Sequence, residues 1–141
     1  MTNVYKSTQI TKISKLFNTG TVKAGDKFLI TDAWNYAVIA IKYMSELLDI
    51  PVEIQSIWHA GAYDPTDILG MKMSKPWPSH FEKAIYYASD YNYFATLFHK
   101  NMFIRNLELW SSFEKATVCG QPHDMNIPLL TQNYNAVKSN R

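Results

Sequence analysis

Two small groups of side chains in this sequence are of types that could do chemistry. Cys119 and His123 lie four residues apart, and a thiol beside an imidazole can act as a nucleophile or bind zinc. A structural zinc site needs about four ligands, and neither a second cysteine nor a nearby histidine accompanies this pair. We therefore expect no metal site, and we expect Cys119 to be a buried residue near a helix end.

The second group is a pair of carboxylates, Asp64 and Asp67, in one loop. Two carboxylates can bind a hard cation or act as acid and base. The alternating acidic residues of a calcium loop are missing, however, and capping of a short helix explains both aspartates. The sequence therefore predicts no catalytic residue and no cofactor, and it favours a protein that is not an enzyme.

A possible ligand pocket is indicated where a short predicted strand, residues 52–59, runs into a loop. Trp58 and His59 close the strand, Tyr63 follows, and the loop over 61–78 is punctuated by glycine and proline. Aromatic side chains with a few polar groups are typical of small-molecule sites. We therefore keep a pocket formed by Trp58, His59 and Tyr63 as an alternative hypothesis.

The aromatic content, with 4 Trp, 9 Tyr and 7 Phe, exceeds what one small core requires. Trp77 lies between two prolines and loses little freedom on binding, so it suits an anchor in a partner's pocket. Tyr86 and Tyr93 lie on a different side of their predicted helix from its other aromatic residues. The residues that we expect to contact a partner are Trp77, Tyr86, Tyr93, Ile127, Leu129, Leu130 and Tyr134.

The elements that would position these residues are mostly helical in the first half of the chain. Residues 1–7 look extended, and 8–18 have apolar residues at helical spacing. Residues 21–23 and 27–30 flank a turn and predict a small β-hairpin. The clearest helix spans 32–49, with Thr31 as its N-cap.

In the second half, Ser79 and Glu82 form a capping-box pattern that predicts a long helix over 79–100. Residues 102–118 predict a further helix, with a strand at 107–109 as the competing interpretation. Residues 121–141 lack helical periodicity and look like an extended C-terminal tail. The expected fold is mainly α, a small bundle of three to four helices with a minor hairpin or short strands, and α+β is the alternative.

Composition limits the class of protein. The chain has 141 residues, of which 47% are hydrophobic and 18% charged, which predicts one globular domain over 1–120 followed by the tail. One cysteine excludes a disulfide framework within the chain. The N-terminus lacks the apolar stretch of a signal peptide, and no apolar run is long enough to span a bilayer. We therefore expect no membrane contact and a location inside a cell, such as the host cytoplasm, or in a virion.

Charge is segregated along the chain, with basic residues dominating 1–27 and 72–141 and acidic residues dominating 28–71. Such segregation arises by chance among solvated surface charges, which need no purpose, and the alternative interpretation is head-to-tail contact between copies. Our first hypothesis is a non-catalytic structural or assembly subunit of a larger symmetric complex, with a phage or virus particle protein as the best example. The alternatives are a small ligand-binding or enzymatic domain with an aromatic pocket, and a single-stranded nucleic-acid binder.

Overall fold

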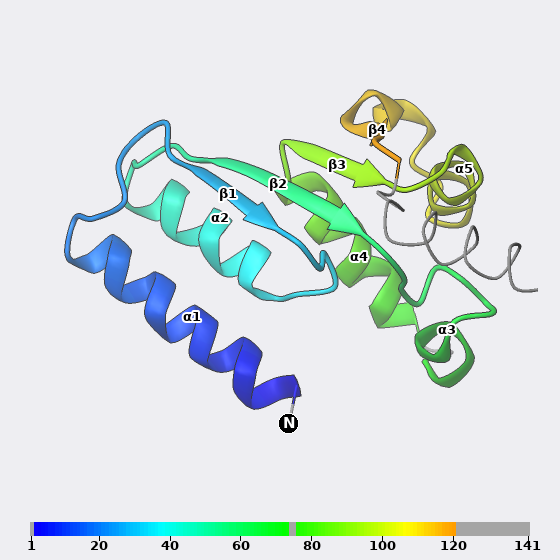
Figure 1. The fold of residues 1–141 in the computed structure, drawn as a ribbon, viewed down its shortest axis with the longest axis horizontal. Helices are drawn as coiled ribbons and strands as arrows, with labels where there is room; N and C mark the ends of the chain where they lie inside the picture. Colours follow the sequence, from blue (N-terminus) through cyan, green and yellow to red (C-terminus); the bar gives the residue numbers. More distant parts are fainter. Residues whose placement is uncertain (1, 74–75, 121–141) are drawn as a thin grey trace, which may run out of the picture.

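The fold is a four-stranded parallel sheet with helices packed against it (Figure 1). The structure, a computed structural model, describes residues 2–73 and 76–120. In chain order the elements are α1 (Thr2–Asn18), β1 (Lys27–Ile30), α2 (Ala37–Leu47), β2 (Glu53–Trp58), α3 (Ile68–Lys72), α4 (Pro76–Ala88), β3 (Tyr91–Phe94), α5 (Leu97–Asn106), the 3-10 helix η1 (Trp110–Lys115) and β4 (Ala116–Val118).

The strands lie in the order β1-β2-β3-β4, and each pairs in parallel with the next one along the chain. Parallel neighbours require a crossover, which α2 supplies between β1 and β2 and α4 between β2 and β3. When successive crossovers have the same hand and the strand order never reverses, their helices lie on one face of the sheet. Figure 1 shows α2 and α4 behind the sheet accordingly.

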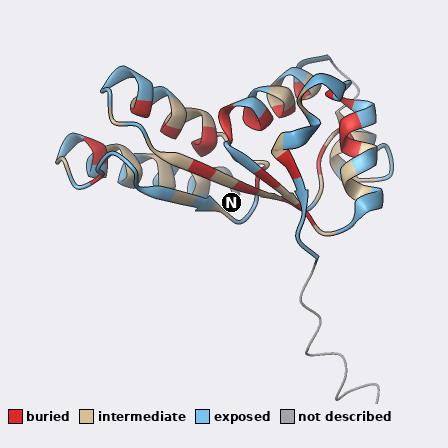
Figure 2. Cartoon of the chain, turned by 90° about the horizontal axis from the view of Figure 1, so that it is seen from above, coloured by how far each residue is buried: buried red, intermediate tan, exposed pale blue. Residues whose placement is uncertain are grey.

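The core lies between this helical layer and the covered face of the sheet. Ile54, Trp58 and Phe94 point from the strands into the core and are fully buried. Val38 and Ile41 of α2 meet them from the helical side, together with residues of α4 and α5. Seen from above, the buried positions gather where the helices face the sheet (Figure 2). Because all four strands are parallel, the loops that follow them leave the sheet at the same end.

The predicted mainly α bundle is wrong, because the fold is α/β with a parallel sheet. The predicted β-hairpin over 21–23 and 27–30 is also wrong. Residues 27–30 pair with β2 in parallel register, Phe28 beside Ile54, rather than with residues 21–23. Residues 21–23 lead instead into a turn that a side chain stabilises, because the Asp26 carboxylate accepts from the Lys23 backbone N–H at 2.8 Å.

The long helices predicted over 79–100 and 102–118 are each interrupted. β3 separates α4 from α5, and the chain leaves α5 before η1 and β4. Asn92, in β3, is fully buried and accepts from the Trp58 indole N–H at 2.8 Å. Residues 107–109, for which a strand was the competing interpretation, form neither helix nor strand, and Glu108 has a φ of 55°. The first interruption depends on partners that are distant in sequence, since β3 pairs with β2 and Asn92 meets Trp58.

Three predicted helix beginnings also differ from the structure. α1 begins at Thr2, so residues 2–7 are helical rather than extended. α2 begins at Ala37 with Tyr36 as its N-cap, and Thr31 does not cap it. α4 begins at Pro76, ahead of the predicted capping box, and its Glu82 is fully buried. Across the part of the chain that the structure describes, none of the helices combines the length and apolar character needed to cross a membrane.

Candidate functional site

A cleft of about 650 Å³ opens at the carboxyl ends of β1 and β2. Its floor comes from the residues that follow these strands, Asp32 after β1 and His59 after β2. Ligands of open α/β sheets bind outside the carboxyl ends of the strands, usually where the strand order reverses. This sheet has no reversal, and α1 and α3 supply the walls through Lys6, Ile68 and other residues.

Lys6 closes the cleft from α1. Its ammonium lies 3.3 Å from a carboxylate oxygen of Asp32 and also donates to the backbone carbonyl of Trp34. The Lys6 side chain is only 13% exposed, whereas that of Asp32 is 56% exposed. Asp32 therefore keeps part of its carboxylate exposed in the cleft. The Lys6 ammonium, by contrast, is largely shielded from solvent beside its two acceptors.

His59 joins the ends of the two strands across the cleft floor. Its Nε2 lies 2.7 Å from the backbone carbonyl oxygen of Thr31, within hydrogen-bond distance. The imidazole is otherwise exposed beside Ala60 and Asp67 in the same cleft. This contact sets the position of His59 relative to Asp32, because Thr31 immediately precedes Asp32.

The wall formed by residues 61–73 depends on a close approach of the backbone to Gly70. A Cβ on Gly70 would lie 1.8 Å from the carbonyl oxygen of Asp64, so only glycine fits there. Asp64 accepts from the backbone N–H of Thr66 at 2.8 Å, and Asp67 caps α3 by accepting from the Leu69 N–H at 2.8 Å. The hydrogen bonds from Thr66 hold the pKa of Asp64 below its usual range. The two predicted aspartates thus shape the loop, and Asp67 also reaches the cleft.

Glu82 supports the cleft from beneath. Its Oε1 accepts from the indole N–H of Trp34 at 2.7 Å and from the backbone N–H of Ala62 at 2.5 Å, while Oε2 has no partner among the described residues. The close approach leaves no room for a Cβ on Gly61, which would lie 2.5 Å from Oε1. Burial raises the pKa of Glu82. One buried carboxyl group therefore ties the Trp34 wall to the loop after β2.

Of the predicted pocket residues, only His59 lines the cleft. Trp58 and Tyr63 are buried and meet edge to face, with ring centroids 6.0 Å apart. The Tyr63 hydroxyl is hydrogen-bonded to Nε2 of His99. Burial raises the pKa of Tyr63 and lowers that of His99, so the pair is neutral and the phenol donates. Of the three predicted pocket residues, the structure therefore brings His59 to the cleft and places Trp58 and Tyr63 in the core.

The predicted partner contacts divide into three environments. Trp77 is 52% exposed and packs against Trp34 and Phe81. Tyr86 is fully buried and donates to the backbone carbonyl of Ser112 at 2.5 Å, so its side chain does not reach the surface. Tyr93 is half-buried on β3. The others, Ile127, Leu129, Leu130 and Tyr134, lie outside the described residues.

Of Cys119 and His123, the thiol and imidazole that the sequence places four residues apart, only Cys119 is described by the structure. Cys119 is exposed rather than buried, at the end of β4, and its backbone N–H donates to the carbonyl of Phe94 at 3.0 Å. His123 lies outside the described residues. Within residues 2–73 and 76–120, no group of three or more histidine, cysteine, aspartate or glutamate side chains could hold a metal ion.

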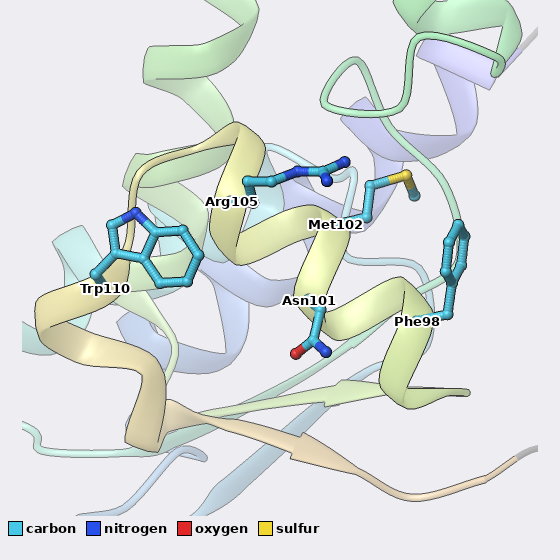
Figure 3. A pocket seen from close by; sticks show the side chains of 5 residues that line it. All are labelled: Phe98, Asn101, Met102, Arg105 and Trp110. Atoms are coloured by element: carbon cyan, nitrogen blue, oxygen red, sulfur yellow. The ribbon is translucent and has the colours of Figure 1, made fainter.

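A second hollow, of about 350 Å³, lies along α5 and shares no lining residue with the cleft (Figure 3). Phe98 is 77% exposed at one end and Trp110 is 63% exposed at the other. Asn101, Met102 and Arg105 line the stretch between them. Large exposed aromatic side chains beside an arginine are typical of protein contact surfaces.

Sequence reasoning missed Asp32, Trp34 and Lys6 as residues of the cleft. Asp32 was interpreted as part of a helix that in the structure begins later, at Ala37. A signal was present, since polar residues directly follow the two segments 27–30 and 52–58 that have the character of strands. That signal has meaning only if the two segments are parallel neighbours, which the hairpin interpretation excluded.

Comparison with known proteins adds no relationship, because no family model, curated protein or solved structure matches the chain. The chemistry of the cleft is therefore the basis for assigning a function.

Proposed function

We propose that this chain is a small-ligand-binding α/β domain whose site is the cleft at the carboxyl ends of β1 and β2. The observation that supports this most strongly is the meeting of Asp32 and His59, from two separate strand ends, in one cleft of about 650 Å³. That volume falls within the range of small-molecule sites, which is roughly 300–1,000 Å³.

The charges of the cleft indicate the class of ligand. Lys6 shares the cleft with two carboxylates, Asp32 and Asp67, and is paired with the first. The cleft thus offers no surplus lysine charge to a phosphate, whereas its carboxylates can accept from hydroxyl or amine donors. Trp34 and Ile68 present apolar surface beside them. A neutral or cationic molecule with hydroxyl or amine groups and one apolar face fits this arrangement.

We expect at least one probe from a panel of monosaccharides, nucleosides and polyamines to bind the full chain at millimolar concentration. Backbone amide shifts in nuclear magnetic resonance spectra should move at Asp32 and His59 and saturate with concentration. Asp32→Asn should weaken that binding about tenfold or more, because a charge-assisted hydrogen bond contributes roughly 1.5–3 kcal/mol.

Asp26→Asn is the matched control, because Asp26 is an exposed aspartate at the opposite end of β1. It should leave the affinity unchanged. The proposal fails if the whole panel leaves the cleft resonances unmoved, or if inorganic phosphate binds there more tightly than any panel member.

Self-assembly is the second candidate function, and the hollow along α5 favours it. Phe98 and Trp110 expose large aromatic surfaces around Arg105, a composition that recurs at the centre of interfaces. We propose that a second copy of this chain occupies the hollow. The assembly-subunit hypothesis then depends on these residues as well as on Trp77, and a virus particle would be one setting for it.

The double variant Phe98→Ser, Trp110→Ser should convert an assembled chain to monomer, because truncating interface aromatics removes about 2 kcal/mol or more each. Light scattering would measure the solution mass of both proteins. Tyr43→Ser is the control, since Tyr43 is 63% exposed on α2, away from the hollow. A wild-type chain that is monomeric at all concentrations tested would contradict self-assembly.

A further inference from the structure

One face of the sheet has no described helix over it. Side chains alternate along parallel strands, and the register places Leu29, Gln55, Ile57, Tyr91 and Tyr93 on the face opposite the core. Figure 1 looks onto this face, with α2 and α4 behind the sheet. We call these five residues the open face.

An open face is unusual for this kind of sheet. All-parallel sheets occur almost only with both faces covered. Here Leu29 is 58% exposed and Tyr91 is 46% exposed, while Ile57 and Tyr93 are half-buried by their neighbours on adjacent strands. Tyr91 and Tyr93 stack with ring centroids 6.5 Å apart. The face therefore carries apolar and aromatic side chains on three strands, with the uncharged polar residue Gln55 between Leu29 and Tyr91.

The charge of the open face limits what can cover it. The nearest ion pair on this side is Lys27 with Glu53, at 3.2 Å, where β1 and β2 begin. Because these two charges neutralise each other, the face has no net charge with which to attract a charged partner. An uncharged, apolar segment is the complementary occupant.

We propose that residues 125–134 of this same chain cover the open face. These residues include Ile127, Leu129, Leu130 and Tyr134, and none of 125–137 is charged. Pro128 has no N–H to donate, so this segment suits packing across a face better than joining a sheet edge. The apolar side chains and the absence of charge match the surface described above.

The chain after Cys119 is long enough for Leu129 to cross the sheet from β4 to β1. Cys119 is held beside β3 by its hydrogen bond to the Phe94 carbonyl, so the segment starts from a known edge of the sheet. Strands are about 4.8 Å apart, which places β1 about 14 Å from β4. Ten extended residues, from Cys119 to Leu129, span up to about 33 Å. Leu129 can therefore reach Leu29 on the far strand.

Disulfide trapping tests this directly. In the full chain with Cys119→Ser, Leu29→Cys and Leu129→Cys would be introduced together, and oxidation would be followed at micromolar concentration by mass spectrometry of the digested protein. The matched control pairs Leu129→Cys with Tyr43→Cys, because Tyr43 is equally exposed but lies on the helical layer. The open-face pair should form an intramolecular disulfide about tenfold faster than the control, since docking raises the effective concentration.

Equal rates for the two pairs would overturn the proposal, as would disulfide-linked dimers, which would place the segment on a neighbouring copy. Tyrosine nitration provides a second readout that needs no substitution. A chain ending at Gly120 should be nitrated several-fold faster at Tyr91 and Tyr93 than the full chain. Unchanged nitration would also contradict the proposal.

Discussion

Replacing Trp58 with alanine should lower the free energy of unfolding by about 3–5 kcal/mol, the range for truncating a buried tryptophan. Trp58 is fully buried, and its ring lies 4.5 Å from that of Phe103, centroid to centroid, and 6.3 Å from that of Phe94. Its indole also donates to the buried amide oxygen of Asn92. Alanine would leave a cavity and an unpaired acceptor together. Urea unfolding measures the loss.

Tyr43→Ala is the control, because Tyr43 is an aromatic residue that is 63% exposed and does not line the hollow along α5. We expect it to change the free energy of unfolding by less than about 0.5 kcal/mol. Trp58→Phe should fall between the two, since it keeps an aromatic ring but leaves Asn92 without its donor, at a cost of about 1–3 kcal/mol. Similar losses for Trp58→Ala and Tyr43→Ala would show that Trp58 is not at the centre of the core.

Replacing Glu82 with alanine should cost about 3 kcal/mol at neutral pH, because two partly buried N–H donors lose their acceptor at once. These donors are the indole of Trp34 and the backbone of Ala62. Glu82→Gln keeps a carbonyl oxygen for both and should cost less than about 1 kcal/mol. Glu82→Ala should also disturb the cleft. Ligand binding and urea unfolding would therefore both be measured.

The two variants also separate hydrogen bonding from charge. Burial raises the pKa of Glu82 above its ordinary value of 4.5, so the folded state holds this proton more tightly than the unfolded state. Its contribution is therefore fully present below about pH 4.5 and is lost as the pH rises through the higher folded pKa. Glu82→Gln does not titrate, so it should gain stability relative to wild type between pH 4.5 and pH 8.

A constant difference between wild type and Glu82→Gln across this pH range would argue against the raised pKa. If Glu82→Gln lost as much stability as Glu82→Ala, acceptance from Trp34 and Ala62 would not be what stabilises this region. Either result would also weaken the case that Glu82 positions the Trp34 wall of the cleft.

Local sequence patterns predicted the elements whose apolar side chains follow a regular period. The apolar spacing of Val38 and Ile41 predicted a helix within 32–49, and the structure has α2 there. The alternation over 52–59 predicted a strand that includes β2. It also located His59, which lines the cleft, at the end of that strand.

Tertiary structure decided everything that depends on distant pairing. The segment 91–94 shares helical spacing with its neighbours, yet it is a strand because Asn92 meets Trp58 and β3 pairs with β2. Glu82 matches a local capping pattern, yet it bonds to Trp34 and Ala62. The cleft itself exists only because β1 and β2 are parallel neighbours, which brings Asp32 and His59 to one edge. A helix is closed by bonds four residues apart, whereas a parallel strand and its site require a partner that no local pattern specifies.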